Sequence, residues 1–120
     1  MTVTFNVAVK FADIRIVEYR GLDANTPFDV TRSASGTSTL ADSGGVTTTT
    51  PTELIFGAGM TKKRFTAAGA GFTKRIITSP DGDIAEDRNA TATGIYSATA
   101  PLNVSGAWLM QIVTFRAAGQ

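Results

Sequence analysis

Hydrophobic and polar residues alternate over much of the chain, which is the pattern of half-buried β-strands. In residues 2–11 every second side chain is apolar and falls on one face: Val3, Phe5, Val7, Val9 and Phe11. A period of two over this length predicts a strand with one buried face. The next segment, residues 14–19, has apolar side chains on both faces, which predicts a central strand of a sandwich.

The middle of the chain predicts three strands separated by two tight turns. Residues 72–79 and 83–90 flank a Pro-Asp-Gly turn at 80–82, in which proline presets φ and glycine accepts a positive φ. Two strand-like runs around a glycine-containing turn are a strong hairpin signal. A second turn at Thr93 and Gly94 leads into residues 95–100, which we expect to return as the third strand.

Two further segments, 53–60 and 108–116, are predicted to be strands. Residues 53–60 read as a strand with Leu54, Phe56 and Ala58 pointing inward. Residues 108–116 carry apolar side chains on both faces, so we expect this last strand to be central. Residues 101–106, between it and the preceding strand, are predicted to form a turn.

Residues 31–45 are rich in Ser, Gly and Thr and poor in bulky side chains. Their position between strands predicts short edge strands near 37–40 and 46–49, because an edge strand needs little core material. The many β-branched residues suit a pleated surface better than a helix. The predicted fold is therefore all-β, an antiparallel, jelly-roll-like β-sandwich with little or no α-helix.

The size and charge of the chain limit its class. Its 120 residues suffice for one domain with one core, so we expect a single sandwich domain over 1–120. A hydrophobic content of 42% with 18% charged residues is typical of a globular protein. The net charge of +1 argues against partners such as nucleic acid or an anionic membrane surface.

Two residue types are absent, and their absence limits the chemistry. The chain has no cysteine and no histidine, which excludes Ser-His-Asp and Cys-His nucleophiles and His-based or thiolate metal sites within it. No run of about 18 apolar residues predicts a membrane-spanning helix. The many Thr, Ser, Ala and Gly residues, with few Lys and Glu, indicate an extracellular or cell-surface protein whose export signal lies upstream.

Several stretches together resemble a known kind of module: ADIRIVEYRGLD at 12–23, ELIFG at 53–57, GF at 71–72 with DIAEDR at 83–88, GIYSAT at 94–99 and WLMQIVTFRA at 108–117. The chain resembles the C-terminal part of a lectin-like, concanavalin-A-like jelly-roll module of secreted or surface proteins in environmental bacteria. The resemblance implies the fold and carries no catalytic signature. Such modules have further strands before Thr2, so we expect N-terminal strands of a longer module to be missing. A bare sheet edge would then favour a homo-oligomer.

Aromatic residues are the first candidate ligand site. Trp108, Tyr96, Tyr19 and Phe72 can stack on the C–H faces of sugars, and Tyr and Trp add a polar group. The alternative is that they pack in the core. Lys62, Lys63 and Arg64 are a candidate contact for an acidic polymer or, alternatively, a solvated turn.

Acidic residues are the second candidate site. Asp81, Asp83, Glu86 and Asp87 form the densest acidic cluster and are the candidate ligands of a Ca²⁺ ion. The alternative is turn chemistry at Asp81 with cross-strand pairing to Lys74 or Arg75, since Glu86 and Asp87 point to opposite faces of a strand. Glu86 and Asp87 with Glu18 would also supply a glycosidase carboxylate pair if they converged.

These observations favour a non-catalytic binding or adhesion module, with a polysaccharide or glycan as its expected ligand and no cofactor other than Ca²⁺. The alternative is a structural subunit that assembles through exposed edges and apolar faces. A glycoside hydrolase that works with carboxylates alone is a third hypothesis.

Overall fold

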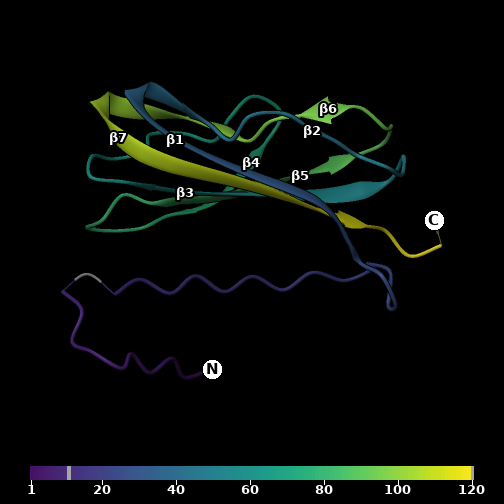
Figure 1. Ribbon diagram of the computed structural model, residues 1–120, viewed down its shortest axis with the longest axis horizontal. Helices are drawn as coiled ribbons and strands as arrows, with labels where there is room; N and C mark the ends of the chain where they lie inside the picture. The colour runs from purple at the N-terminus through teal and green to yellow at the C-terminus, as the bar shows by residue number, and fades with distance from the viewer. Residues whose placement is uncertain (11, 120) are drawn as a thin grey trace.

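The protein is built from β-strands, as a computed structural model describing residues 1–10 and 12–119 shows (Figure 1). The strands are β1 (Phe28–Asp42), β2 (Val46–Thr47), β3 (Glu53–Thr61), β4 (Thr73–Ile77), β5 (Ile84–Ala90), β6 (Ile95–Tyr96) and β7 (Thr99–Arg116). These described residues form no helix, so none is long and apolar enough to cross a membrane. The predicted fold class, an antiparallel β-sandwich with little or no helix, is confirmed.

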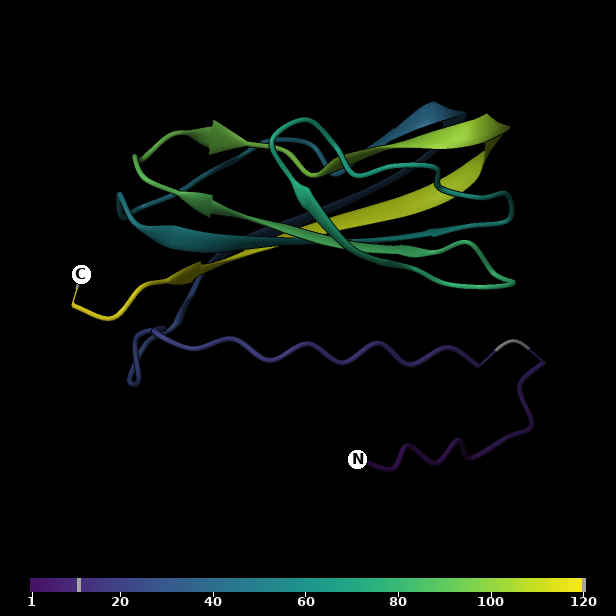
Figure 2. The same ribbon diagram turned by 180° about the vertical axis from the view of Figure 1, so that it is seen from behind.

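The strands form two antiparallel sheets of unequal size. The larger has the order β1-β7-β3-β5-β4, and the smaller pairs β2 with β6. The register of the long β1–β7 pair shifts between Ser38 and Leu40. Beyond this shift the pair folds over toward β2 and β6 (Figures 1 and 2), and the amide of Ser43 donates to the carbonyl of Ala98 at 2.9 Å.

The hydrophobic core lies between the two layers. The five-stranded sheet contributes large side chains from its three middle strands: Ile55, Ile84, Met110 and Ile112. The facing layer contributes Phe65 and a group of mostly small residues: Ala41, Val46, Ala98, Ala100 and Leu102. Large side chains from one layer against small ones from the other allow the sheets to approach closely, and each buried Ile, Leu, Val, Met or Phe side chain contributes roughly 1.5–3 kcal/mol.

The predicted hairpin is confirmed as β4 and β5. Gly82 has φ +78° in the turn, and the amide of Thr78 donates to the carbonyl of Asp83 at 2.8 Å. The third predicted strand is wrong as a partner of this hairpin. Residues 95–100 instead cross to the other layer, where β6 pairs with β2 and the start of β7 pairs with β1.

Other predictions on the sheet need correction. Inward residues of β3 are Ile55, Gly57 and Gly59, whereas Leu54 and Phe56 point to the opposite face. Both faces of β3 are covered by other parts of the protein. The alternation of its apolar residues therefore does not show which face points into the core. Residues 101–106 form no turn but lie inside β7, at the point where its register with β1 shifts.

The short strand predicted near 46–49 is confirmed as β2, whereas the one predicted near 37–40 is part of a much longer edge strand. β1 is a continuous strand of 15 residues at one edge of the larger sheet. Its main-chain groups pair with the apolar strand β7 along most of its length, so it needs few bulky side chains of its own. The prediction that 108–116 is central is confirmed, since β7 lies between β1 and β3.

The predictions of strands at residues 2–11 and 14–19 are wrong. Residues 2–10 and 14–19 form no strand, and Phe11 lies outside the described residues. We call residues 12–22 the strap and residues 1–10 the arm. The strap runs beside the larger sheet and the arm doubles back from it (Figure 2). An alternating segment becomes a strand only when another strand pairs with its main chain, and in the described structure neither segment has such a partner along its length.

Candidate functional site

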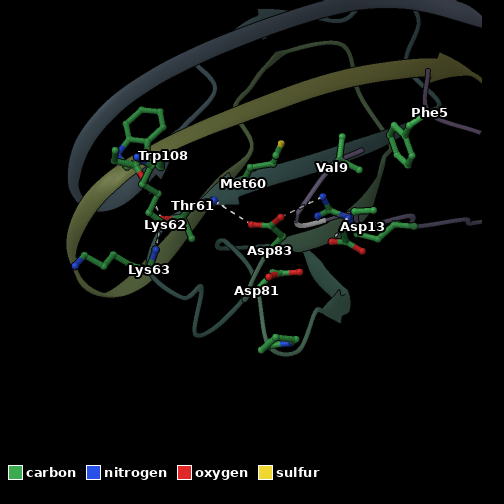
Figure 3. Close-up of a pocket in the computed structure, with 14 residues that line it drawn as sticks. Phe5, Val9, Asp13, Met60, Thr61, Lys62, Lys63, Asp81, Asp83 and Trp108 are labelled. Carbon is green, nitrogen blue, oxygen red and sulfur yellow. Dashed lines mark hydrogen bonds and ion pairs between the residues drawn. The ribbon is translucent and has the colours of Figure 1, made fainter. Parts of the chain in front are cut away.

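A groove of about 840 Å³ lies at one end of the larger sheet, where segments distant in sequence meet. Trp108 of β7 and Lys62 and Lys63 after β3 lie at one end of it, and Phe5 and Val9 of the arm lie at the other (Figure 3). The residues between them come from the end of β3, the β4–β5 turn and the strap: Met60, Thr61, Asp81, Asp83, Asp13 and Arg15. The groove is therefore mixed, with apolar surface beside charges of both signs.

The centre of the groove is fixed by a buried carboxylate. Asp83 is 5% exposed and accepts a hydrogen bond from the amide of Thr61 at 3.0 Å. The Arg15 guanidinium lies 3.6 Å from the same carboxylate, and it also donates to the carbonyl of Ile84 at 3.0 Å. Burial raises the pKa of Asp83, while the Thr61 amide and Arg15 act in the opposite direction. Arg15 thus ties the strap to the groove.

Trp108 is held in one orientation at the groove. Its indole N–H donates to the hydroxyl of Ser38 at 2.9 Å. The ring covers Gly36 on the neighbouring strand, where a Cβ would come within 2.7 Å of the indole. Because any side chain at position 36 would displace the ring, glycine there lets the half-buried indole lie flat across β1.

The other predicted aromatic residues lie elsewhere. Phe72 and Tyr96 flank the Arg88 guanidinium, whose carbon lies 5.6 and 5.0 Å from the two ring centroids. Tyr19 lies on the other face of the larger sheet, edge-on to Phe56 with ring centroids 6.3 Å apart. The four predicted ligand-binding aromatics therefore occupy three places, and Trp108 is the one that lines the groove.

The predicted acidic cluster is likewise divided. Asp81 and Asp83 line the groove, Glu86 points into the core, and Asp87 lies on the opposite face of β5. The predicted cross-strand pair with Arg75 is confirmed: its Nε and Nη2 donate to the two oxygens of Asp87 at 2.5 and 2.8 Å. Among residues 1–10 and 12–119, no three acidic side chains converge to hold a metal ion.

Glu86 is the residue whose environment the sequence analysis missed. Its side chain is fully buried, with Oε2 accepting a hydrogen bond from the amide of Gly69 at 2.8 Å and Oε1 without a partner in the described part of the chain. Burial raises its pKa to about 7. Glu86 shares a face of β5 with Ile84, so the period of two could have placed it inside. Glu18, by contrast, has a side chain that is 83% exposed on the strap.

The strap is fixed to the sheet by Tyr19. Its hydroxyl donates to Asp87, which also receives the Arg75 guanidinium. Burial raises the pKa of Tyr19 to about 12, and the Asp87 carboxylate adds to the rise. Burial alone would raise the pKa of Asp87, but the hydrogen bonds from Arg75 and Tyr19 outweigh it, so this pKa lies below its ordinary value.

Replacing Tyr19 with phenylalanine should release the strap without unfolding the sheets. The variant loses a hydrogen bond to a charged group, a contribution of about 1.5–3 kcal/mol, while Arg75 still neutralises Asp87. We expect trypsin to cleave after Arg20, next to Tyr19, about tenfold faster, as followed by mass spectrometry. The control is Tyr96→Phe, which removes a phenol bond to the carbonyl of Ala92 away from the strap. Equal cleavage of both variants would contradict this role.

No protein-family model, curated protein or solved structure matches this chain. The resemblance to lectin-like modules therefore stays a prediction, and the site is interpreted from its own chemistry.

Proposed function

We propose that the protein is a non-catalytic, extracellular binding module that holds a carbohydrate in the groove beside Trp108. The observation that carries the proposal is the combination of a fixed, half-buried indole with charged side chains in one concave site. Ligand sites in proteins are typically concave and largely apolar, with a few convergent polar groups that orient the ligand.

The chemistry of the groove suits a polyhydroxylated ligand. An aromatic ring packs against the C–H face of a sugar, and the hydroxyls of the sugar form hydrogen bonds with charged side chains at the rim of the site. Lys62 and Asp81, which both line the groove, supply a donor and an acceptor. Asp83 is already engaged by Thr61 and Arg15, so it supports the site by holding its shape.

The positions of the three carboxylates considered for a glycosidase support a binding role. A glycosidase needs two carboxyl groups facing one sugar at about 5–10 Å, but Glu86 points into the core, Asp87 pairs with Arg75 on the opposite face, and Glu18 is exposed on the strap. The surface rich in Thr, Ser and Gly supports placement outside the cell or on its surface.

Binding can be tested with the protein's own fluorescence, because Trp108 is its single tryptophan. We expect gluco-, chito- and manno-oligosaccharides, titrated to millimolar concentration, to include at least one that changes the emission with saturation. Asp81→Asn and Lys62→Ala should each raise the Kd about fivefold, which corresponds to the loss of about one hydrogen bond.

The control is Lys74→Ala, which removes an exposed lysine from β4, outside the groove. This variant should bind like the unmodified protein. A flat titration with every sugar class would count against the proposal, and so would equal weakening in Lys62→Ala and Lys74→Ala.

A further inference from the structure

The arm has the sequence of a strand, and Phe5 and Val9 line one end of the groove, but in the described structure its main chain pairs with no strand. Its odd-numbered apolar residues remain between 45 and 67% exposed: Val3, Phe5, Val7 and Val9. In the described part of the chain, residues 2–10 share no hydrogen bond with any other segment. Each extended residue has a main-chain donor and acceptor, and β-branched or aromatic side chains at every second position are best accommodated by a sheet.

The larger sheet has an open edge that fits such a strand. β1 pairs with β7 without interruption from Thr31 to Ser38, and its other side has no neighbouring strand in the described structure. The opposite edge, β4, has 5 residues, a register shift, and the charged Lys74 and Arg75. Short, irregular and charged edges resist strand addition, whereas a long, regular and mostly uncharged edge permits it.

The side chains of the arm and of β1 also match. On β1 the inward residues are small and half-buried, Ala34, Gly36 and Ser38, whereas the alternate positions are exposed hydroxyl residues. Large apolar side chains on an added strand would cover this open flank of the core. The Thr and Asn side chains of the arm would then continue the polar outer face of β1. The arm and β1 each have one face with apolar or small residues and one polar face. A single pairing register therefore places the apolar faces together on one side of the sheet and the polar faces on the other.

We propose that residues 2–10 of one copy add as a strand to the open edge of β1 in a second copy of this chain, and that the exchange is reciprocal. Each copy then contributes nine arm residues and the eight residues from Thr31 to Ser38. These numbers approach the roughly 20–30 residues per side of a stable interface. Reciprocal exchange closes the assembly as a symmetric dimer.

The dimer can be tested by sedimentation velocity over a concentration series. Val7→Lys places a charge in the apolar row of the arm, whereas the matched control, Asn6→Lys, places the same charge in the polar row. Both positions are exposed in the monomer. We expect the unmodified chain to dimerise as concentration rises, Val7→Lys to raise the dimer Kd at least about tenfold, and Asn6→Lys to change it little.

Cross-linking tests which segments meet. Since the chain has no cysteine, Asn6→Cys in one copy and Ser35→Cys in another provide one thiol each. Under mild oxidation, the mixture should form the mixed disulfide dimer, and a mixture of Asn6→Cys with Lys74→Cys should form much less. A strict monomer at millimolar concentration would overturn the proposal. Arm amides protected from hydrogen exchange in a monomer, which would show pairing within one chain, would also overturn it, as would equal cross-linking to β1 and β4.

Discussion

Replacing Gly69 with alanine is expected to destabilise the protein by more than about 3 kcal/mol, the range of severe overpacking. A Cβ at this position would lie 2.0 Å from the carbonyl oxygen of Thr99 and 2.6 Å from its Oγ1. The obstacle is the main chain at the start of β7, which cannot rotate away as a side chain can. The loop would have to move, and the amide of Gly69 would then leave the buried carboxylate of Glu86.

The effect can be measured by thermal and urea unfolding. For a domain of this size a loss of about 3 kcal/mol lowers the Tm by more than about 10 °C. The matched control is Gly94→Ala, because a Cβ there would meet the ring of Tyr96 at 3.6 Å, an ordinary contact. We expect this control to change stability by less than about 0.5 kcal/mol. A Gly69→Ala protein as stable as the control would show that the loop yields easily.

Local patterns explain why part of the fold could be predicted. The β4–β5 hairpin is encoded within residues 72–90 by two strand-like runs and a turn in which Gly82 adopts a positive φ. The central position of β7 follows from apolar side chains on both of its faces. In each case the residues that determine the element lie close together in the sequence.

The errors occur where the outcome depends on a distant partner. Residues 2–10 alternate more regularly than any other segment, yet they form no strand, because pattern alone supplies no neighbouring main chain. β1 has the opposite character: its small polar residues gave a weak signal, but β7 pairs with it for most of its length. The partner strand, rather than the segment's own composition, decides whether an extended segment becomes a strand.

The candidate groove illustrates the same dependence on distant contacts. It joins residues of the arm, the strap, β3, the hairpin turn and β7, and no sequence spacing connects Asp13 with Trp108. The acidic cluster could be resolved only partly. Alternation placed Glu86 and Asp87 on opposite faces, and Ile84 marks the face of Glu86 as interior, but the hydrogen-bond partners of the two carboxylates lie on the strap and on the loop at Gly69.

The consequence for Glu86 is a stability that depends on pH near neutrality. Its pKa is about 7 in the folded protein, against 4.5 for an ordinary glutamate, because burial disfavours the carboxylate. Protonated Glu86 is therefore favoured by folding, and this stabilisation is present at low pH and lost as pH rises through 7. We expect the free energy of unfolding to fall by about 2–3 kcal/mol between pH 5 and pH 8.

Glu86→Gln should remove most of this dependence. The amide is neutral at every pH, and its oxygen can still accept the hydrogen bond from Gly69. The variant should be about 2–3 kcal/mol more stable than the unmodified protein at pH 8 and similar to it at pH 5, as measured by urea unfolding. Burial also raises the pKa of Asp83, so Asp83 likewise makes the free energy of unfolding fall as pH rises, but at lower pH. This smaller dependence remains in the variant.

The window from pH 5 to pH 8 is well suited to this measurement. The chain has no histidine, the side chain that normally titrates there. Asp29 and Asp87, whose pKa values are lowered, stabilise the fold above the ordinary aspartate pKa and lose this effect only in stronger acid. The control is Glu18→Gln on the exposed strap, which should keep the full slope. If Glu86→Gln also keeps the full slope, a group other than Glu86 produces the pH dependence and this assignment is wrong.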